Sequence, residues 1–284
     1  RSSAASDVYK RQDLWMSMAY FIEQQVDYCI IEAGMGGRLD ATTALDYKAC
    51  LITNVGLDHT EYLGDTFEQI AYEKSGVFKP NVPALTTEDK PECQKVMELV
   101  ADYMNTPLCF VDCQETDVLR WDGMTFHLNP PLYQAKNLSL ALETLNVLGI
   151  WLEENEIQEV IDHFQWAGRY MVLRKDPLVL LDGAHNVHGI TALIQSLKDF
   201  TGKIYFSVLK EKDAPHMIEL LQSISKDITL VEISSARLYP LEELGYPIIT
   251  VDELISRLLD TKEDSLLCGS LYYVGEVLEK WGNV

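Results

Sequence analysis

The chain has 284 residues, a length that suggests two domains, with 47% hydrophobic and 24% charged residues. This composition excludes a disordered, collagen-like or disulfide-stapled small protein, and no run approaches the roughly 18 apolar residues of a membrane span. The formal net charge of −21 argues against general binding to nucleic-acid phosphates, which requires clustered Lys and Arg. We therefore expect neither a nucleic acid nor a membrane as partner.

The charge is uneven along the chain. Residues 1–163 hold 11 basic and 27 acidic side chains, a net charge of −16, whereas residues 164–284 hold 12 and 17, a net charge of −5. This difference is a first sign of two unlike halves. The six cysteines form no C-x-x-C pair and no secretory signal is visible, so we expect reduced thiols in a cytoplasmic protein.

The first twelve residues differ in character from the rest of the chain. Residues 1–12 are polar, have no hydrophobic period and contain no apolar signal-peptide core. We interpret them as a non-native leader and exclude them from the fold prediction. The chain is then expected to be a fragment of a protein that begins upstream of Asp13.

Helix and strand signals alternate from there on. In chain order we expect a helix over 14–25, strands over 26–31 and 49–53, a helix over 66–75, a strand over 82–85, a helix over 91–104, a strand over 107–111, a hairpin over 117–128 around Asp122-Gly123, and a helix over 133–148. Later strands are expected over 178–181, 203–208, 228–233 and 265–268, and helices over 188–200, 214–224, 252–259 and 271–281. The alternation predicts an α/β fold with parallel sheets covered by helices on both faces, and a domain boundary near 164–169.

Polar residues follow the first two predicted strands, where ligands gather in such sheets. Glu32 and a glycine-rich segment, Gly34–Asp40, follow the first strand, and Asp58-His59 follows the second. A carboxylate and an imidazole suit Mg²⁺ when phosphate oxygens and water complete its shell. The alternative is that Glu32 caps a turn and His59 is an ordinary loop histidine. The glycine spacing is not G-x-G-x-x-G, so no dinucleotide site is supported.

The second half has a comparable segment. The strand 178–181 leads into Asp182-Gly183-Ala184-His185-Asn186, directly before a helix. Asp, His and Asn at such a junction can hold a ribose, a phosphate and an attacking group near a helix N-terminus. The alternative is that Asn186 caps the helix and Asp182 is structural. Ser270, after the last strand, gives a similar but weaker signal.

Six motifs occur in an order that resembles one family. They are Glu32-x-Gly34-x-Gly36-Gly37-Arg38-x-Asp40-Ala41-Thr42, Thr53-Asn54-x-Gly56-x-Asp58-His59, Leu63-Gly64-x-Thr66 with Ile70-Ala71-x-Glu73-Lys74-x-Gly76, Trp166-x-Gly168-Arg169, Asp182-Gly183-Ala184-His185-Asn186, and Gly269-Ser270-Leu271-Tyr272. Over residues 13–284 the chain resembles an N-terminally truncated folylpolyglutamate synthase/dihydrofolate synthase of the Mur ligase family. The resemblance implies part of a central Mg-ATP-binding domain over 13–165 and a Rossmann-like C-terminal domain over 166–284.

The resemblance also implies an activity. It is that of an ATP-dependent ligase, usually a monomer, which phosphorylates a folate or dihydropteroate carboxylate and adds L-glutamate to the acyl phosphate. Glu32 and His59 would bind Mg²⁺, and Lys74 would be the lysine that is carbamylated beside the metal. Asn137 and Arg169 would contact the nucleotide, and Asp182 and His185 would lie at its ribose and phosphates. His185 would also be catalytic. The resemblance further implies four substrate or turn contacts, Arg38, Asp40, Asp58 and Ser270.

Departures and alternatives accompany the resemblance. Thr43 and Ser75 replace the family's usual Asn and Ala, and no G-x-x-x-x-G-K-[ST] loop is present, so the chain alone is expected to be inactive. If the resemblance is set aside, Lys74 is interpreted as a surface lysine on a helix, and Arg169 can equally form an interdomain ion pair. Another Mur-type ligase, a non-catalytic nucleotide-binding module, and more weakly a hydrolase, stay open as other functions.

Overall fold

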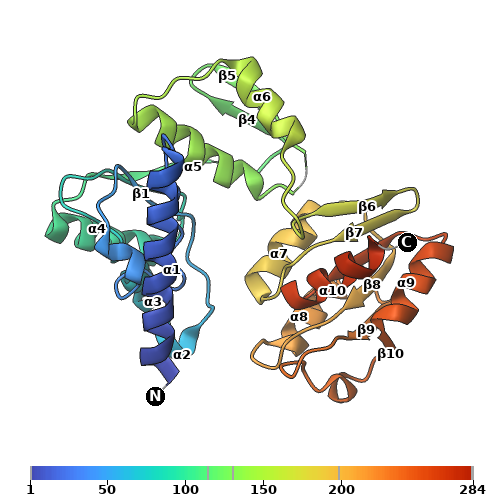
Figure 1. Cartoon of the computed structure of the whole chain (residues 1–284). Coiled ribbons are helices and arrows are strands. Elements are labelled where there is room, and N and C mark those ends of the chain that lie inside the picture. Colours follow the sequence, from blue (N-terminus) through green and yellow to red (C-terminus); the bar gives the residue numbers. More distant parts are fainter. Residues whose placement is uncertain (1, 114, 130, 198, 283–284) are drawn as a thin grey trace. The chain divides into compact units, whose positions relative to one another are not determined.

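The computed structural model describes residues 2–113, 115–129, 131–197 and 199–282, and only the backbone of residues 2–8 (Figure 1). It divides into two compact units, Arg1–Gln114 with Lys136–Trp151, and Glu115–Ala135 with Leu152–Val284. The second unit begins earlier in the chain than the expected boundary between 165 and 166, and that boundary stays a prediction. The foreign origin of residues 1–12 also stays a prediction. Residues 2–12 belong to the first helix, α1 (Ser2–Gln24).

The first unit is built on a small parallel sheet. Its elements are α1 (Ser2–Gln24), the 3-10 helix η1 (Ala41–Ala44), β1 (Cys50–Ile52), α2 (Thr60–Leu63), α3 (Phe67–Ser75), β2 (Ala84–Thr86), α4 (Pro91–Met104), β3 (Leu108–Phe110) and α5 (Gln134–Val147). The strands lie in the order β1-β2-β3. Apolar side chains of β1 and β2 pack with those of α3 and α4 into one core, for example Ile52, Ile70 and Met97. This core fixes the carboxyl ends of β1 and β2 beside α3.

The strand expected over 26–31 is wrong. This segment pairs with no strand in the described structure, and Tyr28 and Ile30 are 66% and 95% exposed. A short apolar run forms a strand only where a neighbour can take its main-chain hydrogen bonds and cover its side chains. Here β1 is the edge of the sheet and remains unpaired on that side within the described residues.

The second unit carries a larger sheet. Its elements are β4 (Val118–Trp121), β5 (Met124–His127), α6 (Glu154–His163), β6 (Met171–Lys175), β7 (Leu178–Leu181), α7 (Val187–Ser196), β8 (Lys203–Phe206), α8 (Ala214–Leu221), β9 (Ile228–Glu232), the 3-10 helix η2 (Leu241–Leu244), β10 (Ile248–Thr250), α9 (Val251–Asp260), β11 (Ser265–Cys268) and α10 (Leu271–Trp281). Six strands lie in the order β10-β9-β8-β11-β7-β6. All neighbours are parallel except β6, which runs antiparallel to β7. The expected all-parallel sheet is thus mixed, and neither β6 nor β10 was predicted.

Helices cover both faces of this sheet, as the alternation of elements predicts. Leu180 and Ile204 pack with residues of α7 and α8, whereas the neighbouring Leu181 and Tyr205 pack with residues of α9 and α10. Successive residues of a strand point to opposite faces, so a strand that is buried on both sides is continuously apolar. The residues that follow β7, β8 and β11 therefore emerge together at one edge.

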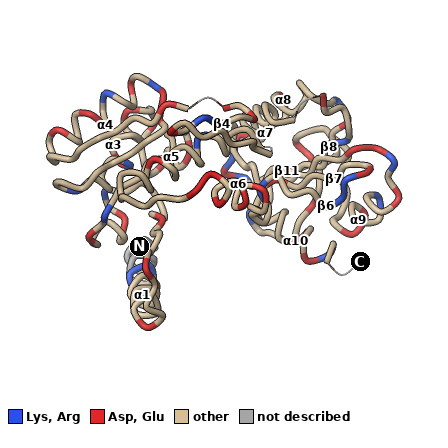
Figure 2. The backbone as a smooth tube through the Cα atoms, turned by 90° about the horizontal axis from the view of Figure 1, so that it is seen from above, with Lys and Arg blue, Asp and Glu red and all other residues tan. Residues whose placement is uncertain are grey.

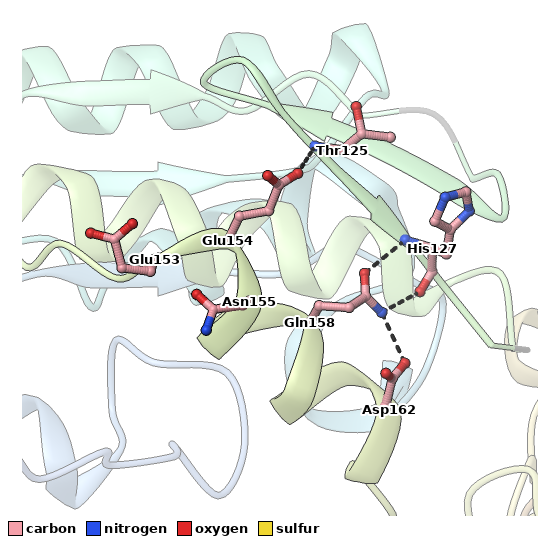
Figure 3. Close-up of a pocket in the computed structure, with 7 residues that line it drawn as sticks. All are labelled: Thr125, His127, Glu153, Glu154, Asn155, Gln158 and Asp162. Carbon is pink, nitrogen blue, oxygen red and sulfur yellow. Dashed lines mark hydrogen bonds between the residues drawn. The ribbon is translucent and has the colours of Figure 1, made fainter.

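The hairpin of β4 and β5 is confirmed, with Asp122 and Gly123 both at positive φ as a two-residue type I′ turn requires. Helix α6 lies along β5, and Figure 3 shows the hollow between them. Glu154 accepts a hydrogen bond from Thr125 N, and Gln158 bonds both main-chain groups of His127. These side chains satisfy the open edge of β5, which otherwise invites pairing with another chain.

Acidic side chains are spread along both units. Asp and Glu outnumber Lys and Arg in the chain, and Figure 2 shows where they lie on the backbone. Over the described residues, no helix combines the length and the apolar character that crossing a bilayer requires.

Candidate functional site

The glycine-rich segment docks closely on the end of α3. Arg38 N donates to the carbonyl oxygen of Glu73 at 2.8 Å, and Arg38 Nε and Nη2 donate to Glu73 Oε1 at 2.9 and 2.8 Å. A Cβ on Gly76 would lie 2.2 Å from Arg38 Cα, and one on Gly37 would lie 2.8 Å from the carbonyl oxygen of Lys74. Only residues without a side chain permit this approach, so the two glycines bring the loop against the turn that carries Lys74.

Asp40 closes the same loop from within. Its Oδ2 accepts from Gly34 N at 3.0 Å, and its Oδ1 accepts from Thr42 N at 3.0 Å and Thr42 Oγ1 at 2.8 Å. Burial alone would raise the pKa of Asp40, but the hydrogen bonds from Thr42 and Gly34 outweigh it and hold the pKa below its usual value. Thr43, where the family usually has Asn, donates its hydroxyl to the carbonyl oxygen of Gly37. Asp40 therefore has a structural role in this loop, as Arg38 does through Glu73.

Lys74 is half-buried among carboxylates. Burial lowers the pKa of its ammonium group below the usual value, while the negative charges of Asp58, Glu32 and Glu88 act in the opposite direction. The structure thus brings the predicted residues Lys74, Glu32 and Asp58 into one neighbourhood, at the carboxyl end of the small sheet. Glu88 is an addition that sequence reasoning missed, although it follows β2 by two residues, and the strand-end argument used for Glu32 applies equally to it.

His59 lies at the start of α2, where it occupies the N-cap position with φ 54°. Its main-chain N–H donates to Asp58 Oδ1 at 2.9 Å, and its side chain is exposed. No group of three or more His, Cys, Asp or Glu side chains within the described ranges is gathered to hold a metal ion. Mg²⁺ usually takes one or two carboxylates from a protein and completes its shell with water and phosphate, so Glu32 fits this ion in donor chemistry. The place of His59 at the metal stays a prediction.

Asn137 lies on an exposed face of α5, in the first unit. Its neighbour Lys136 donates to Asp89 Oδ2 at 2.7 Å, and this hydrogen bond lowers the pKa of Asp89. Arg169, with which Asn137 is expected to share a nucleotide, belongs to the second unit. Their common contact stays a prediction.

The β7–α7 turn of the second unit centres on Asp182, which is 2% exposed. Its Oδ2 and Oδ1 accept from Tyr170 N and Ala184 N, each at 2.7 Å. Burial raises the pKa of Asp182, and these two hydrogen bonds together with the positive charges of Arg169 and His185 only partly offset that rise. Arg169, Asp182 and His185 are therefore neighbours, as the sequence predicts, and Asp182 also anchors the turn.

Close packing and capping shape the rest of this turn. A Cβ on Gly183 would lie 2.6 Å from Arg169 Nη1, so the guanidinium lies over the glycine. His185 Nδ1 lies 2.8 Å from the carbonyl oxygen of Gly183, which assigns the proton of a neutral ring to Nδ1. Asn186 Oδ1 accepts from Gly189 N at 2.7 Å and caps α7, the structural alternative considered for it.

Ser270 has a similar capping role. It is buried at the N-terminus of α10, and its Oγ accepts from Tyr272 N at 3.2 Å. The structure thus gathers two sets of predicted residues, Lys74 with Glu32 and Asp58, and Arg169 with Asp182 and His185. Their binding and catalytic roles stay predictions.

Comparison with known proteins agrees with this geometry. The Mur ligase middle domain family matches residues 9–130. The chain is 28% identical to the dihydrofolate synthase/folylpolyglutamate synthase of Bacillus subtilis, over 92% of this chain and 69% of that protein. It is 29% identical to the Escherichia coli protein of the same name, over 94% of this chain and 67% of that one.

Solved structures show the same likeness. The bifunctional folylpolyglutamate synthase/dihydrofolate synthase of Yersinia pestis, complexed with AMPPNP and Mn, has a TM-score of 0.81 at 25% identity, and the match covers 93% of this chain and 68% of that chain. The chain thus spans about two thirds of the length of these relatives. Their common fold confirms the expected Mur-ligase α/β architecture. Over most of its length the chain is thus similar to folylpolyglutamate synthases/dihydrofolate synthases, and residues 9–130 match the Mur ligase middle domain, as the resemblance implied.

Proposed function

We propose that this chain carries part of the active site of an ATP-dependent ligase that joins L-glutamate to a folate or dihydropteroate carboxylate. The observation that carries the proposal is the half-buried Lys74, which lies within electrostatic range of Asp58, Glu32 and Glu88 on the turn where the glycine-rich segment docks. Relatives with this fold have been crystallised with Mn, AMPPNP and L-glutamate, and with ADP. A monomeric state and a cytoplasmic location belong to the same proposal.

The proposed reaction has two transfers. A carboxylate oxygen of the folate attacks the γ-phosphorus of ATP, which yields an acyl phosphate and ADP. The amino group of glutamate then attacks the acyl carbon, loses a proton, and expels inorganic phosphate as the amide forms. A divalent cation would neutralise phosphate charge when bound, and Glu32 and His59 would hold it.

Lys74 is the proposed site of carbamylation. Burial lowers its pKa and so raises the share of neutral amine, the form that adds CO₂ and releases a proton to give a carbamate. The carbamate is an anion, and beside three carboxylates it is repelled unless a cation is present. We therefore expect the modification to depend on divalent metal.

In the second unit, Arg169 and His185 provide the positive charge and the proton-carrying ring of the site. Arg169 lies beside the buried Asp182 and over Gly183, where a guanidinium is held ready for phosphate oxygens. His185, with Nδ1 bonded to Gly183, has Nε2 as its remaining acceptor. Asp182 fixes the turn that carries both.

Incorporation of labelled glutamate into dihydropteroate and into tetrahydrofolate tests the proposal, with the protein that carries this chain at its native length. Lys74→Ala and His185→Ala are expected to lower kcat by at least about 100-fold, whereas Lys203→Met, in an exposed ion pair with Glu263, should change nothing. A ¹³C-bicarbonate NMR signal that requires Mg²⁺ and is absent in Lys74→Ala would support the carbamate. Nucleotide binding without any glutamate ligation would instead favour a non-catalytic module.

A further inference from the structure

The buried Glu88 and the partly buried Lys90 form a clamp around one residue of the loop that leads to His59. Glu88 is 2% exposed, and its carboxylate accepts from the main-chain N–H groups of Val55, Asp89 (3.1 Å) and Lys90 (2.9 Å). Lys90 Nζ donates to Glu88 Oε1 at 3.1 Å and to the carbonyl oxygen of Val55 at 2.9 Å. One ion pair thus satisfies both main-chain polar groups of Val55, which is fully buried.

Two further side-chain hydrogen bonds support this arrangement, one between the two segments and one within the segment that follows β2. Thr87 Oγ1 donates to the carbonyl oxygen of Thr53 at 2.6 Å, and Gln94 Nε2 donates to that of Glu88 at 2.8 Å. The segment Thr87–Lys90, which we name the clamp segment, therefore grips residues 53–55 immediately after β1. From there the chain continues for only a few residues to Asp58 and His59.

The clamp segment also contacts the two helices that carry predicted site residues. Lys90 Nζ lies 5.3 Å from the ring centroid of Phe67, the first residue of α3, and the charge of Glu88 acts on Lys74 of the same helix. Asp89 pairs with Lys136 of α5 at 2.7 Å. Four consecutive residues thus connect the end of β1, helix α3 and helix α5.

A buried carboxylate is costly unless all its hydrogen bonds are made, and an apolar residue would stabilise a core more simply. The ion pair instead determines the main-chain path of the loop, because its hydrogen bonds to the N–H and carbonyl groups of Val55 are compatible with only one path. We infer that Glu88 and Lys90 are positioning residues that hold the Val55–His59 loop in one path and so keep Asp58 near Lys74 and fix the position of His59 at the start of α2. The effect on the loop stands on geometry alone, whereas its effect on metal and nucleotide binding rests on the proposed function.

The variant Glu88→Gln tests the clamp with little change of shape. Both carboxylate oxygens accept hydrogen bonds, so the amide must turn its NH₂ group toward N–H donors on one side. Lys90→Met removes only the charged group and keeps most of the stem. Lys203→Met is the matched control, since its ion pair with Glu263 has the same 3.1 Å separation and lies in the other unit.

Hydrogen exchange of the full chain is the first measurement. In Glu88→Gln and Lys90→Met the amides of residues 55–59 are expected to exchange at least about tenfold faster, while those of Met97 and Ala101 in α4 keep their protection. The control should leave both regions unchanged. Faster exchange throughout the first unit, or no change at residues 55–59, would overturn the inference and leave a general stabilising role.

The second measurement is the Mg²⁺ dependence of turnover at saturating ATP. Loss of a positioning residue should raise the Mg²⁺ concentration at half-maximal rate about 10–100-fold, with kcat at saturating Mg²⁺ much less affected. A fall in kcat with no change in the Mg²⁺ requirement would contradict positioning. This assay uses the native-length protein that carries the chain. If that protein without substitutions showed no Mg²⁺-dependent nucleotide turnover, the proposed function would fail, and hydrogen exchange alone would then decide the clamp.

Discussion

The substitution Gly76→Ala separates backbone propensity from packing at the site. Gly76 has φ −61° and ψ −8°, a right-handed helical conformation that alanine adopts more readily than glycine. Yet the added Cβ would lie 2.2 Å from Arg38 Cα and 2.5 Å from Arg38 N. These are main-chain atoms, so the glycine-rich segment must move as a whole to relieve the overlap.

The magnitude is the balance of opposing contributions. Alanine in place of a helical glycine gains up to about 1 kcal/mol. Overpacking costs about 1–3 kcal/mol, and displacement of the segment loses the Arg38 N–Glu73 hydrogen bond, which contributes about 0.5–1.5 kcal/mol. We therefore expect Gly76→Ala to lower the free energy of unfolding by about 0.5–4.5 kcal/mol. In α10, a Cβ on Gly275 would meet nothing within 4 Å, so Gly275→Ala should gain about 0.5–1 kcal/mol.

Urea unfolding of both variants, followed by fluorescence and far-UV circular dichroism, measures the two changes. Hydrogen exchange should show the loss in Gly76→Ala at residues 34–40 and at the end of α3. If Gly76→Ala were as stable as Gly275→Ala, the close docking of the glycine-rich segment on α3 would be refuted.

The altered pKa values of Lys74 and Asp40 each make stability depend on pH. Burial holds the pKa of Lys74 below 10.5, so the unfolded chain binds this proton more tightly, and the free energy of unfolding should rise as pH rises from the folded pKa toward 10.5. The variant Lys74→Met should remove that rise when urea unfolding is measured at a series of pH values. An unchanged dependence on pH in this variant would contradict the reasoning. Asp40→Ala should cost about 0.5–2 kcal/mol at pH 7 through the lost cap. Since the folded pKa of Asp40 lies below 3.8, the stability difference between the unsubstituted protein and Asp40→Ala should persist down to this pH and shrink as pH falls further. Thermal unfolding of both proteins at pH 7 and at a pH well below 3.8 measures it. An equal stability difference at the two pH values would count against the capping role.

Much of the local structure is set by local signals. Helix α4 begins at Pro91 and ends at Met104 as predicted, since proline favours a first turn and the left-handed Asn105 ends the helix. The Asp122-Gly123 turn and the strand β11 likewise match the expectation. The strand-end rule placed Asp182 and His185 correctly at the turn after β7.

The fold departs from the prediction where partners distant in sequence decide. Residues 26–31 have strand composition but no pairing neighbour among the described residues, and the short edge strands β6 and β10 form only because β7 and β9 offer them hydrogen bonds. Asn186 and Ser270 cap helices α7 and α10, which accounts for their positions, whereas the sequence alone left a binding role open for both.

The sequence by itself indicated the alternation of elements and the family motifs, because periodicity and residue spacing are properties of the chain. It named Glu32 and His59 from predicted strand ends, although the strand expected before Glu32 does not form, and Lys74 from the motif resemblance alone. Only the tertiary structure showed that Lys74 lies within electrostatic range of Asp58, Glu32 and Glu88, and that Lys90 and Glu88 hydrogen-bond to Val55. The reason is physical: a pKa and a partly buried ion pair depend on groups that lie far apart in the sequence. Lys90 and Val55 are 35 positions apart and Lys74 and Glu32 are 42 apart, and only packing brings them within hydrogen-bond or Coulomb range.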